Sequence, residues 1–353
     1  MVLKKIMEDL MPEKIAVAMS GGVDSSVSAF LLKKAGYEVH GVTFYLFNSE
    51  NAEKAINDAE KVAKTIGIHH FVLDLTQEFK SSVIDYFISE YTNGKTPNPC
   101  VMCNKNIKFG IALEKLLNLG FKKIATGHYS QIVNLNGRFG VRKNKNIKDQ
   151  SYCFCLLSQD QLSKIITPIA KFSKDEVRKI AKDNNIFVWD KHDSQDICFI
   201  KNSYKDFLHE FGIKNKPGNF IDEDGNILGR HNGIFNYTVG QRRGLNISLG
   251  ARTYVKKINP ISHEVTLSDR FAAEKIILKN INFVSFEKEK IPKDIKVCVR
   301  YNSKPADAEI EIKNQSEAEI IFKNPTFNVC PGQFAVCYFD DYLALGGVID
   351  KVN

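Results

Sequence analysis

The chain has 353 residues, of which 43% are hydrophobic and 25% are charged, a composition typical of globular proteins with several packed cores. No apolar run approaches the ~20 residues that span a bilayer, and the N-terminus lacks a signal-peptide core, so we expect a cytoplasmic protein without a membrane partner. The formal net charge of +8 permits a polyanionic partner without proving one. In the cytoplasm a disulfide framework is not expected, so the eight cysteines would serve burial, catalysis, redox chemistry or metal binding.

The first informative stretch predicts a strand, a tight turn and a helix start. The apolar run Ile15–Met19 ends in Ser20–Gly22, and apolar residues recur at helical spacing from Val23 onward. Glycines let backbone N–H groups approach an anion, while serine hydroxyls and a helix N-terminus add further attraction. The string Ser-Gly-Gly-Val-Asp-Ser-Ser therefore predicts a phosphate-binding turn. It lacks the lysine of the P-loop and the third glycine of the dinucleotide fingerprint, which excludes both of those motifs.

Helical and extended patterns then alternate, which predicts a doubly wound parallel sheet of the α/β class. The predicted helices are Val27–Lys34, Ala52–Thr65 and Gln77–Tyr91, and the predicted strands are Val39–Leu46, Phe71–Leu73 and Lys123–Ala125. Ligands of such sheets bind at the carboxyl ends of the strands. Ser20, Phe44 and Thr126–Tyr129 lie at such ends, so we expect them around one ligand.

The segment 94–105 carries two prolines and two cysteines. The prolines argue against regular structure and stiffen the loop, and an amphipathic helix is predicted for Ile107–Leu119. A cysteine held just before a helix N-terminus, with Lys105 close in sequence, suits a thiolate.

Simple packing and metal binding compete with a catalytic role for the cysteines. Cys100 and Cys103 could form half of a zinc site, for which Cys153 and Cys155 would be a poorly spaced second pair. Three further cysteines lie among strand-like apolar residues, and we expect them in the core: Cys298, Cys330 and Cys337.

The middle of the chain is predicted to form a hairpin, a basic loop and two helices. These are Gln131–Arg142, Lys143–Gln150, Ser158–Ile166 and Ser173–Asn184. Cys198 follows in an apolar setting. From Pro217 short strands replace long helices, and Gly240–Leu245 is a basic segment that is either a solvated turn or a phosphate clamp. Alternating segments after Lys279 predict a small antiparallel barrel.

An ordered set of motifs along nearly the whole chain resembles the bacterial tRNA-specific 2-thiouridylases, which belong to the PP-loop ATP pyrophosphatase superfamily. Each motif alone is weak, and their common order makes the set specific. The motifs are Ser20–Ser26, Thr96–Pro99, Cys103–Lys105, Ala125–Tyr129, Lys148–Tyr152, Ile197–Ile200, Gly240–Leu245, Arg300–Tyr301 and Pro331–Gln333.

The resemblance implies three domains, which agree with the change of pattern along the chain. Residues 1–205 would form the PP-loop ATP-binding catalytic domain, residues 206–275 a small central domain, and residues 276–353 a C-terminal antiparallel β-barrel that contacts tRNA.

The resemblance also implies the site residues. ATP would contact Ala18, Met19, Ser20, Gly21, Gly22, Val23, Asp24, Ser25, Phe44 and Gly127. The target base would face Asn98, Pro99 and Cys100, and the tRNA would touch Lys148, Asp149, Gln150, Arg300 and Tyr301. Cys103 would be the nucleophile and Cys198 the persulfide carrier, while Asp24 would help to hold Mg²⁺ on the departing pyrophosphate.

The implied chemistry is thiolation at C2 of the wobble uridine in the tRNAs for Lys, Glu and Gln. AMP transfer to O2 makes this oxygen a good leaving group, once the uridine has left its stack. A cysteine desulfurase or sulfur-relay protein would load Cys198, and Cys103 would free a sulfide or form a disulfide with Cys198.

The chain departs from the family's usual pattern at several positions. Cys100 stands where the family usually has an aspartate that is a candidate acid or base, Ala18 replaces a glycine, and residues 194–196 differ. Cys153 and Cys155 replace residues that are commonly apolar. These departures leave a second scheme open, in which three cysteines ligate an iron–sulfur cluster with one open iron site. The three are Cys100, Cys103 and Cys198.

Other function classes stay open from the residues alone. An amidating PP-loop synthetase would need an ammonia channel or a glutaminase part, which we do not find. A cytidine-thiolating relative would also use cysteines, but Gly240–Leu245 and the predicted barrel argue against it. The non-enzymatic alternative is an RNA-binding module with ATP as a structural ligand, which paired cysteines in stiff loops disfavour.

Overall fold

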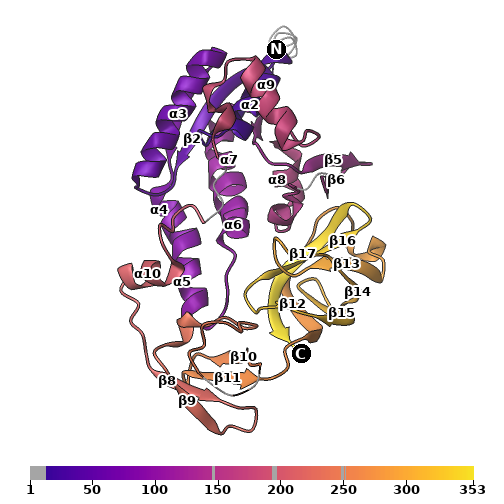
Figure 1. Cartoon of the computed structure of the whole chain (residues 1–353). Helices are drawn as coiled ribbons and strands as arrows, with labels where there is room; N and C mark the ends of the chain where they lie inside the picture. The colour runs from indigo at the N-terminus through magenta and orange to yellow at the C-terminus, as the bar shows by residue number, and fades with distance from the viewer. Residues whose placement is uncertain (1–12, 145–147, 193–196, 248–249, 251) are drawn as a thin grey trace. The chain divides into compact units, whose positions relative to one another are not determined.

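The computed structural model describes residues 13–144, 148–192, 197–247, 250 and 252–353. The chain divides into two compact units, residues 1–82 with 102–195 and residues 83–101 with 196–353 (Figure 1). Each unit is therefore built from two separate segments of the chain. Across the described ranges, no helix combines the length and the apolar character that a bilayer crossing requires.

A five-stranded parallel sheet in the order β3-β2-β1-β4-β7 forms the first unit, as the alternating pattern predicts. Its strands are β1 (Lys14–Ala18), β2 (Glu38–Tyr45), β3 (His69–Asp74), β4 (Lys123–Ala125) and β7 (Ile165–Ile166). The long helices of this unit are α2 (Val23–Lys34), α3 (Glu50–Ile66) and α9 (Lys174–Asp183). They pack on the sheet through a core that includes Val17, Val27, Val62 and Val177. Strands β1 and β4 are neighbours, so their carboxyl ends share one edge.

Two predicted helices differ in the structure. The pattern at 77–91 forms α4 (Thr76–Phe79), a π-helical turn (Lys80–Ile84) and α5 (Asp85–Thr92). The pattern at 158–166 ends early, as α8 (Gln159–Ser163), and the last two isoleucines form β7 instead. The reason is pairing with β4, because the Thr126 N–H donates to the carbonyl of Ile166 at 3.1 Å.

The cysteine segment also differs from the prediction of a loop that precedes a helix. A helix begins at Pro99, with α6 (Pro99–Met102) followed by a π-helical stretch (Cys103–Ile111), and α7 (Ala112–Asn118) comes after a kink at Gly110, whose φ and ψ are not helical. Proline suits the first helical position because its missing N–H is not needed there. The side chain of Asn98 supports this start by accepting the Val101 N–H at 3.2 Å. Both cysteines therefore lie inside a helix.

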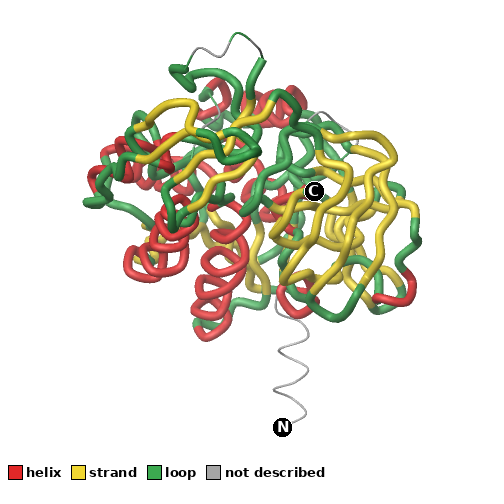
Figure 2. The backbone as a smooth tube through the Cα atoms, turned by 90° about the horizontal axis from the view of Figure 1, so that it is seen from below, coloured by secondary structure: helices red, strands yellow, loops and turns green. Residues whose placement is uncertain are grey.

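The second unit contains a small four-stranded sheet and a closed barrel. The small sheet has the order β10-β11-β8-β9, from Tyr254–Asn259, Glu264–Ser268, Gly218–Ile221 and Ile227–His231. The predicted antiparallel barrel is confirmed: it runs β12-β15-β14-β13-β16-β17 and closes through β12 and β17 (Figure 2). Its strands are β12 (Ala273–Phe283), β13 (Asp294–Cys298), β14 (Ala306–Ile312), β15 (Glu317–Thr326), β16 (Phe334–Phe339) and β17 (Tyr342–Val352).

A hairpin and a short helix complete the fold. The predicted hairpin forms as β5 (Gln131–Leu135) and β6 (Arg138–Arg142), and its turn residues Asn136 and Gly137 both have positive φ. Helix α10 (Tyr204–Glu210) packs against α5 in the second unit, where Tyr91 stacks on Tyr204 with ring centroids 4.6 Å apart.

Candidate active site

The turn after β1 has a backbone that only glycine accepts without strain. Gly21 has a φ of +66°, and a Cβ there would lie 2.5 Å from the carbonyl oxygen of Ala55. The Lys191 ammonium group holds the turn from the other side, because it donates to the Gly21 carbonyl at 2.9 Å. The same ammonium group pairs with Asp58 at 2.7 Å. Helix α3 and Lys191 therefore fix the shape of the turn before any ligand binds.

The serines of the motif divide into supporting and accessible groups. Ser26 donates to the Gly22 carbonyl at 2.8 Å, and Ser25 donates to the same carbonyl at 3.2 Å. Ser20 is exposed at the turn. Gly22 is the N-cap of α2 and has no side chain to bond the first N–H groups of this helix. These N–H groups and the positive end of the helix dipole are thus suited to bind a phosphate.

Asp24 is the centre of a cluster of polar side chains beside the turn. Its Oδ1 accepts hydrogen bonds from the Tyr129 hydroxyl at 2.6 Å and from Lys174 Nζ at 2.7 Å. Its Oδ2 lies 3.4 Å from Lys148 Nζ. The three charged side chains are 19–30% exposed, so the cluster is partly buried and open to a ligand. Lys174 leaves no signal for this site in the sequence, because 150 residues separate it from Asp24 and the packing of α2 and α9 brings them together.

Gly127 brings the end of β4 against the first turn of α2. A Cβ at this position would lie 2.7 Å from the Ser25 nitrogen and 2.8 Å from the Asp24 carbonyl carbon. Next to it, burial and then the charge of Lys108 lower the pKa of His128 to about 3, so its imidazole is neutral at physiological pH. The structure thus brings the predicted residues 18–25 together with Gly127, while Phe44 lies within β2 opposite Leu73.

The predicted tRNA-contacting residues 148–150 make contacts within the first unit. Gln150 accepts the Tyr129 N–H at 2.9 Å. Asp149 accepts the Ser151 hydroxyl at 2.6 Å, and burial raises the pKa of this carboxyl group despite its hydrogen bonds. Together with the bond from Lys148 to Asp24, these contacts organise the edge of the candidate nucleotide site.

The two predicted catalytic cysteines lie in different units and differ in exposure. Cys103 belongs to the first unit and is 7% exposed, whereas Cys198 belongs to the second unit and is exposed. No disulfide links cysteines in the part of the chain that the structure describes. Within the same residues, no group of three His, Cys, Asp or Glu side chains is arranged to hold a metal, so the zinc alternative gains no support. The atypical residues 194–196 lie outside the described residues.

Asn98 and its neighbours are anchored to the barrel inside the second unit. The Gln333 side-chain amide donates to the carbonyls of Thr96 and Pro97, both at 3.0 Å. The Thr96 N–H donates in turn to the Pro331 carbonyl at 2.9 Å. Two motifs more than 200 residues apart therefore form one rigid structure, which places Pro99 and the exposed Cys100 at the start of α6.

Cys198 lies in a turn, and the next residue, Phe199, is buried. The Ile200 N–H donates to the Ile197 carbonyl at 3.0 Å, which closes the turn. Phe199 is 3% exposed and packs edge to face on Phe87 with ring centroids 5.4 Å apart. The Cys198 thiol is thus exposed, while the packing of Phe199 on Phe87 fixes the backbone that carries it.

The last two predicted contact residues differ in their surroundings. Arg300 donates from Nε to the Asn328 carbonyl at 2.8 Å and from Nη2 to Cys330 Sγ at 2.5 Å. Tyr301 is 39% exposed. Burial raises the pKa of Cys330, although the charge of Arg300 opposes the shift.

Cys298, Cys330 and Cys337 are all buried, so the prediction that they belong to the core is confirmed.

Comparisons with known proteins match nearly the whole chain. Three family profiles match in succession: a tRNA methyl transferase HUP domain at residues 13–202, a tRNA methyl transferase PRC-barrel domain at 205–269 and an aminomethyltransferase beta-barrel domain at 273–349. The tRNA-specific 2-thiouridylase MnmA of Lachnoclostridium phytofermentans is 42% identical over 96% of this chain and 100% of its own length. The MnmA of Clostridium kluyveri is 42% identical over 97% of this chain and 100% of its own length.

This chain belongs to the tRNA-specific 2-thiouridylase family. It is accordingly a PP-loop sulfurtransferase that thiolates tRNA at a uridine C2, and the family implies ATP as its nucleotide. Among solved structures, the U34-tRNA thiolase NcsA from Methanococcus maripaludis, described with its [4Fe-4S] cluster, is 18% identical with a TM-score of 0.36. This match covers 57% of the present chain and 66% of the NcsA chain.

The close approach of Gly127 gives a first prediction. Replacing Gly127 with Ala places a methyl group within 3 Å of backbone atoms at Asp24 and Ser25, so the turn must move. We expect the affinity for ATP, measured by calorimetry, to fall at least roughly tenfold, together with a stability loss of about 1–3 kcal/mol.

Gly36→Ala is the matched control. Gly36 also has a positive φ but has open space around its Cβ position, so this variant should lose stability while binding ATP normally. If Gly127→Ala binds ATP as tightly as the unmodified chain, the close approach is not needed to shape the site.

Proposed function

We propose that this thiouridylase adenylates O2 of the wobble uridine before sulfur enters at C2. The observation that supports it best is the turn at residues 20–22, which is rigid, faces the uncapped N-terminus of α2 and adjoins two lysines at Asp24. The uridine O2 attacks the α-phosphorus of ATP, the bond to the bridging oxygen breaks, and pyrophosphate leaves. The N3 proton passes to a base, which leaves a neutral adenylated uridine. Because O2 now carries the AMP group, it can leave C2 as AMP.

Sulfur transfer then uses the two cysteines that the resemblance singles out. A persulfide on Cys198 attacks C2, AMP leaves, and the base is joined to Cys198 through a disulfide. The Cys103 thiolate attacks the Cys198 sulfur, which releases the 2-thiouridine anion and leaves a Cys103–Cys198 disulfide. The anion takes up a proton, and a cellular dithiol reduces the disulfide with two electrons. In the alternative order, Cys103 attacks the persulfide first and frees a sulfide that attacks C2.

Lysine side chains are proposed to neutralise the departing pyrophosphate. Lys174 and Lys148 contact the Asp24 carboxylate in the first turn of α2, and their ammonium groups can move from Asp24 to phosphate oxygens. Before the lysines move, two cations and a tyrosine hydroxyl occupy the Asp24 carboxylate, so this arrangement fits Mg²⁺ poorly. We therefore assign no step to a metal at Asp24.

The remaining assignments follow the family. Asn98, Pro99 and Cys100 would face the target base, and the wobble uridines of the Lys, Glu and Gln tRNAs would be the substrates. A cysteine desulfurase or a sulfur-relay protein would load Cys198, whose exposure suits a large donor. We expect the enzyme in the cytoplasm, because its substrate is tRNA.

An iron–sulfur cluster on Cys100, Cys103 and Cys198 is the second candidate mechanism. The presence of a thiol at position 100 favours it, since three thiolates leave one iron open for a sulfide. Anaerobic purification with iron and sulfide analysis tests it. An iron-free preparation that thiolates tRNA would exclude the cluster.

The direct test of the function is an ATP-dependent thiolation assay. Purified enzyme, ATP, cysteine, a desulfurase and a tRNA with a wobble uridine should yield 2-thiouridine, as measured by mass analysis of nucleosides. Release of pyrophosphate without 2-thiouridine would assign a different product to the same ATP chemistry. Binding of tRNA without any ATP turnover would contradict the proposed reaction.

The persulfide scheme predicts that Cys103→Ser and Cys198→Ser each lower the rate of thiolation at least roughly a thousandfold. ATP binding should stay normal in both variants. The reason is that serine cannot carry or release a persulfide sulfur. Radiolabelled sulfur should load onto Cys103→Ser but not onto Cys198→Ser. Cys153→Ser is the control, because Cys153 is half-buried and has neither proposed role. Full activity in either catalytic variant would contradict the scheme.

The lysine assignment predicts that Lys174→Ala weakens ATP binding about 10- to 100-fold, the range expected from the loss of a charge-assisted hydrogen bond. Binding of ATP and release of pyrophosphate are the two measurements, each with and without Mg²⁺. Lys179→Ala is the matched control, because Lys179 is an exposed lysine of the same helix. If Lys174→Ala binds ATP normally, Lys174 serves only to restrain Asp24.

A further inference from the structure

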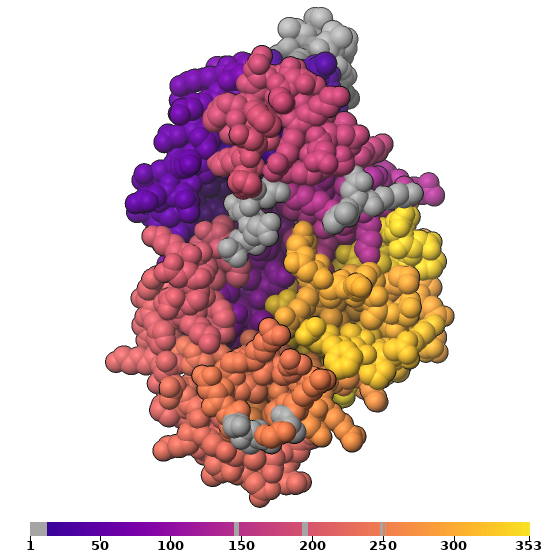
Figure 3. Space-filling view, viewed as in Figure 1, coloured from indigo at the N-terminus to yellow at the C-terminus, as the bar shows by residue number. Residues whose placement is uncertain are grey.

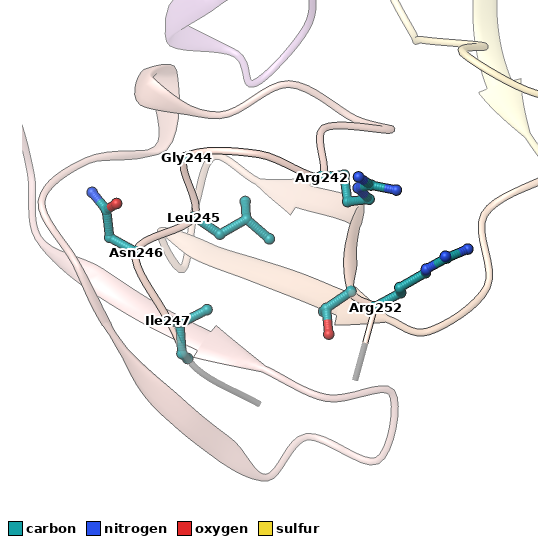
Figure 4. Close-up of a pocket in the computed structure, with 7 residues that line it drawn as sticks. Arg242, Gly244, Leu245, Asn246, Ile247 and Arg252 are labelled. Atoms are coloured by element: carbon teal, nitrogen blue, oxygen red, sulfur yellow. The ribbon is translucent and has the colours of Figure 1, made fainter. Parts of the chain in front are cut away.

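A pocket in the small sheet of the second unit is not used by the mechanism above. It has a volume of about 340 Å³ and lies between the chain at residues 242–247 and the start of β10. Its walls comprise Arg242, Gly244, Leu245, Asn246, Ile247, Arg252 and Thr253. Figure 4 shows that the side chains of Arg242 and Arg252 extend toward the same side.

The chain segment that forms this pocket carries charges of one sign. Residues 240–257 contain five lysines and arginines and no aspartate or glutamate. Arg242 and Arg252 are exposed, and the ion pairs found among the described residues do not involve them. Lys256, in contrast, is paired with Glu223. In Figure 3 the orange surface of these residues lies open on the face shown.

The wall that carries Arg242 is held in place by hydrogen bonds on both sides. The Gln241 side chain accepts the Thr238 N–H at 2.9 Å and donates to the Arg243 carbonyl at 2.9 Å. The backbone of Gly240 and Gln241 bonds to Val255 at 2.8 and 2.9 Å. Leu245 lies in the same buried cluster as Val255, at 6% exposure. The backbone at Arg242 is therefore fixed before an anion binds, which limits the entropy lost on binding.

We propose that this pocket binds a backbone phosphate of the tRNA, with Arg242 and Arg252 as its two ligands. A guanidinium group offers N–H donors in a fork that matches phosphate oxygens, and two such groups can hold one phosphodiester. The contact reads no base, so it increases affinity and fixes the position of the tRNA on the enzyme. The proposal rests on tRNA as the substrate and extends its interface to the small sheet.

The test compares the double variant Arg242→Ala/Arg252→Ala with Arg243→Ala. Arg243 neighbours Arg242 in sequence and is exposed, but it does not line the pocket, so the control removes one charge without removing the site. We expect the double variant to bind tRNA roughly tenfold more weakly at low salt. The plot of log Kd against log salt should lose a slope of about one, as for one phosphate contact. Arg243→Ala should change both quantities far less.

Kinetics and a conservative variant separate this contact from folding and catalysis. In the thiolation assay the double variant should raise KM for tRNA and keep kcat, and Arg242→Lys/Arg252→Lys should restore most of the salt slope. An equal loss of tRNA affinity in the double variant and in Arg243→Ala would show that the pocket is not a specific site. A melting temperature of the double variant low enough to explain its loss of affinity would also overturn the proposal. If the unmodified chain fails to thiolate while the salt slopes behave as expected, the proposed function fails and this interface stands.

Discussion

Close backbone contact around the first turn of α2 is the constraint on which the first unit depends. Gly21 passes beside the Ala55 carbonyl, and Gly127 passes beside the backbone of Asp24 and Ser25, at distances that no Cβ would allow. The contact at Gly127 requires that β1 and β4 are neighbouring strands that end at the same edge of the sheet. They are, because β1 and β4 pair in parallel, with Ile15 opposite Lys123 and Val17 opposite Ala125. The sheet order therefore has a direct chemical consequence. It brings two glycine turns against one helix N-terminus, which is where a polyphosphate would find unsatisfied N–H groups.

The same edge carries one carboxylate and two ammonium groups before ATP binds. Asp24 would be an unfavourable neighbour for phosphate if it stood alone, but Lys148, Lys174 and the Tyr129 hydroxyl surround its carboxylate. A partly buried carboxylate without such partners would pay a large desolvation cost. The cluster thus stabilises the unliganded site and holds two cations within reach of an incoming anion.

Much of this arrangement could be predicted from the sequence, because it depends on local patterns. The strand, glycine turn and helix at residues 15–31, the parallel sheet and the barrel each leave periodic or turn signals in the chain. The start of a helix at Pro99 differs from the prediction of an irregular loop, because proline disfavours a helix interior but is favoured at the first helical position. Lys174 and the bond from Gln333 to the Thr96 carbonyl left no local signal. They depend on packing between segments that are 150 and more than 200 residues apart.

The exposure of the two cysteines suits opposite roles in one transfer. A thiol that receives sulfur from another protein must be reached by a large donor, and Cys198 is exposed beside the buried anchor Phe199. A thiol that acts only inside the closed site gains from protection, because accessible thiolates are the ones that oxidise irreversibly. Cys103, at 7% exposure within a helix, has this protection. Cys100 is exposed like Cys198, so a thiol at this position needs a role that tolerates solvent, such as facing a flipped base or ligating iron. Iron content and base contact are therefore the two properties that would explain why a cysteine stands here.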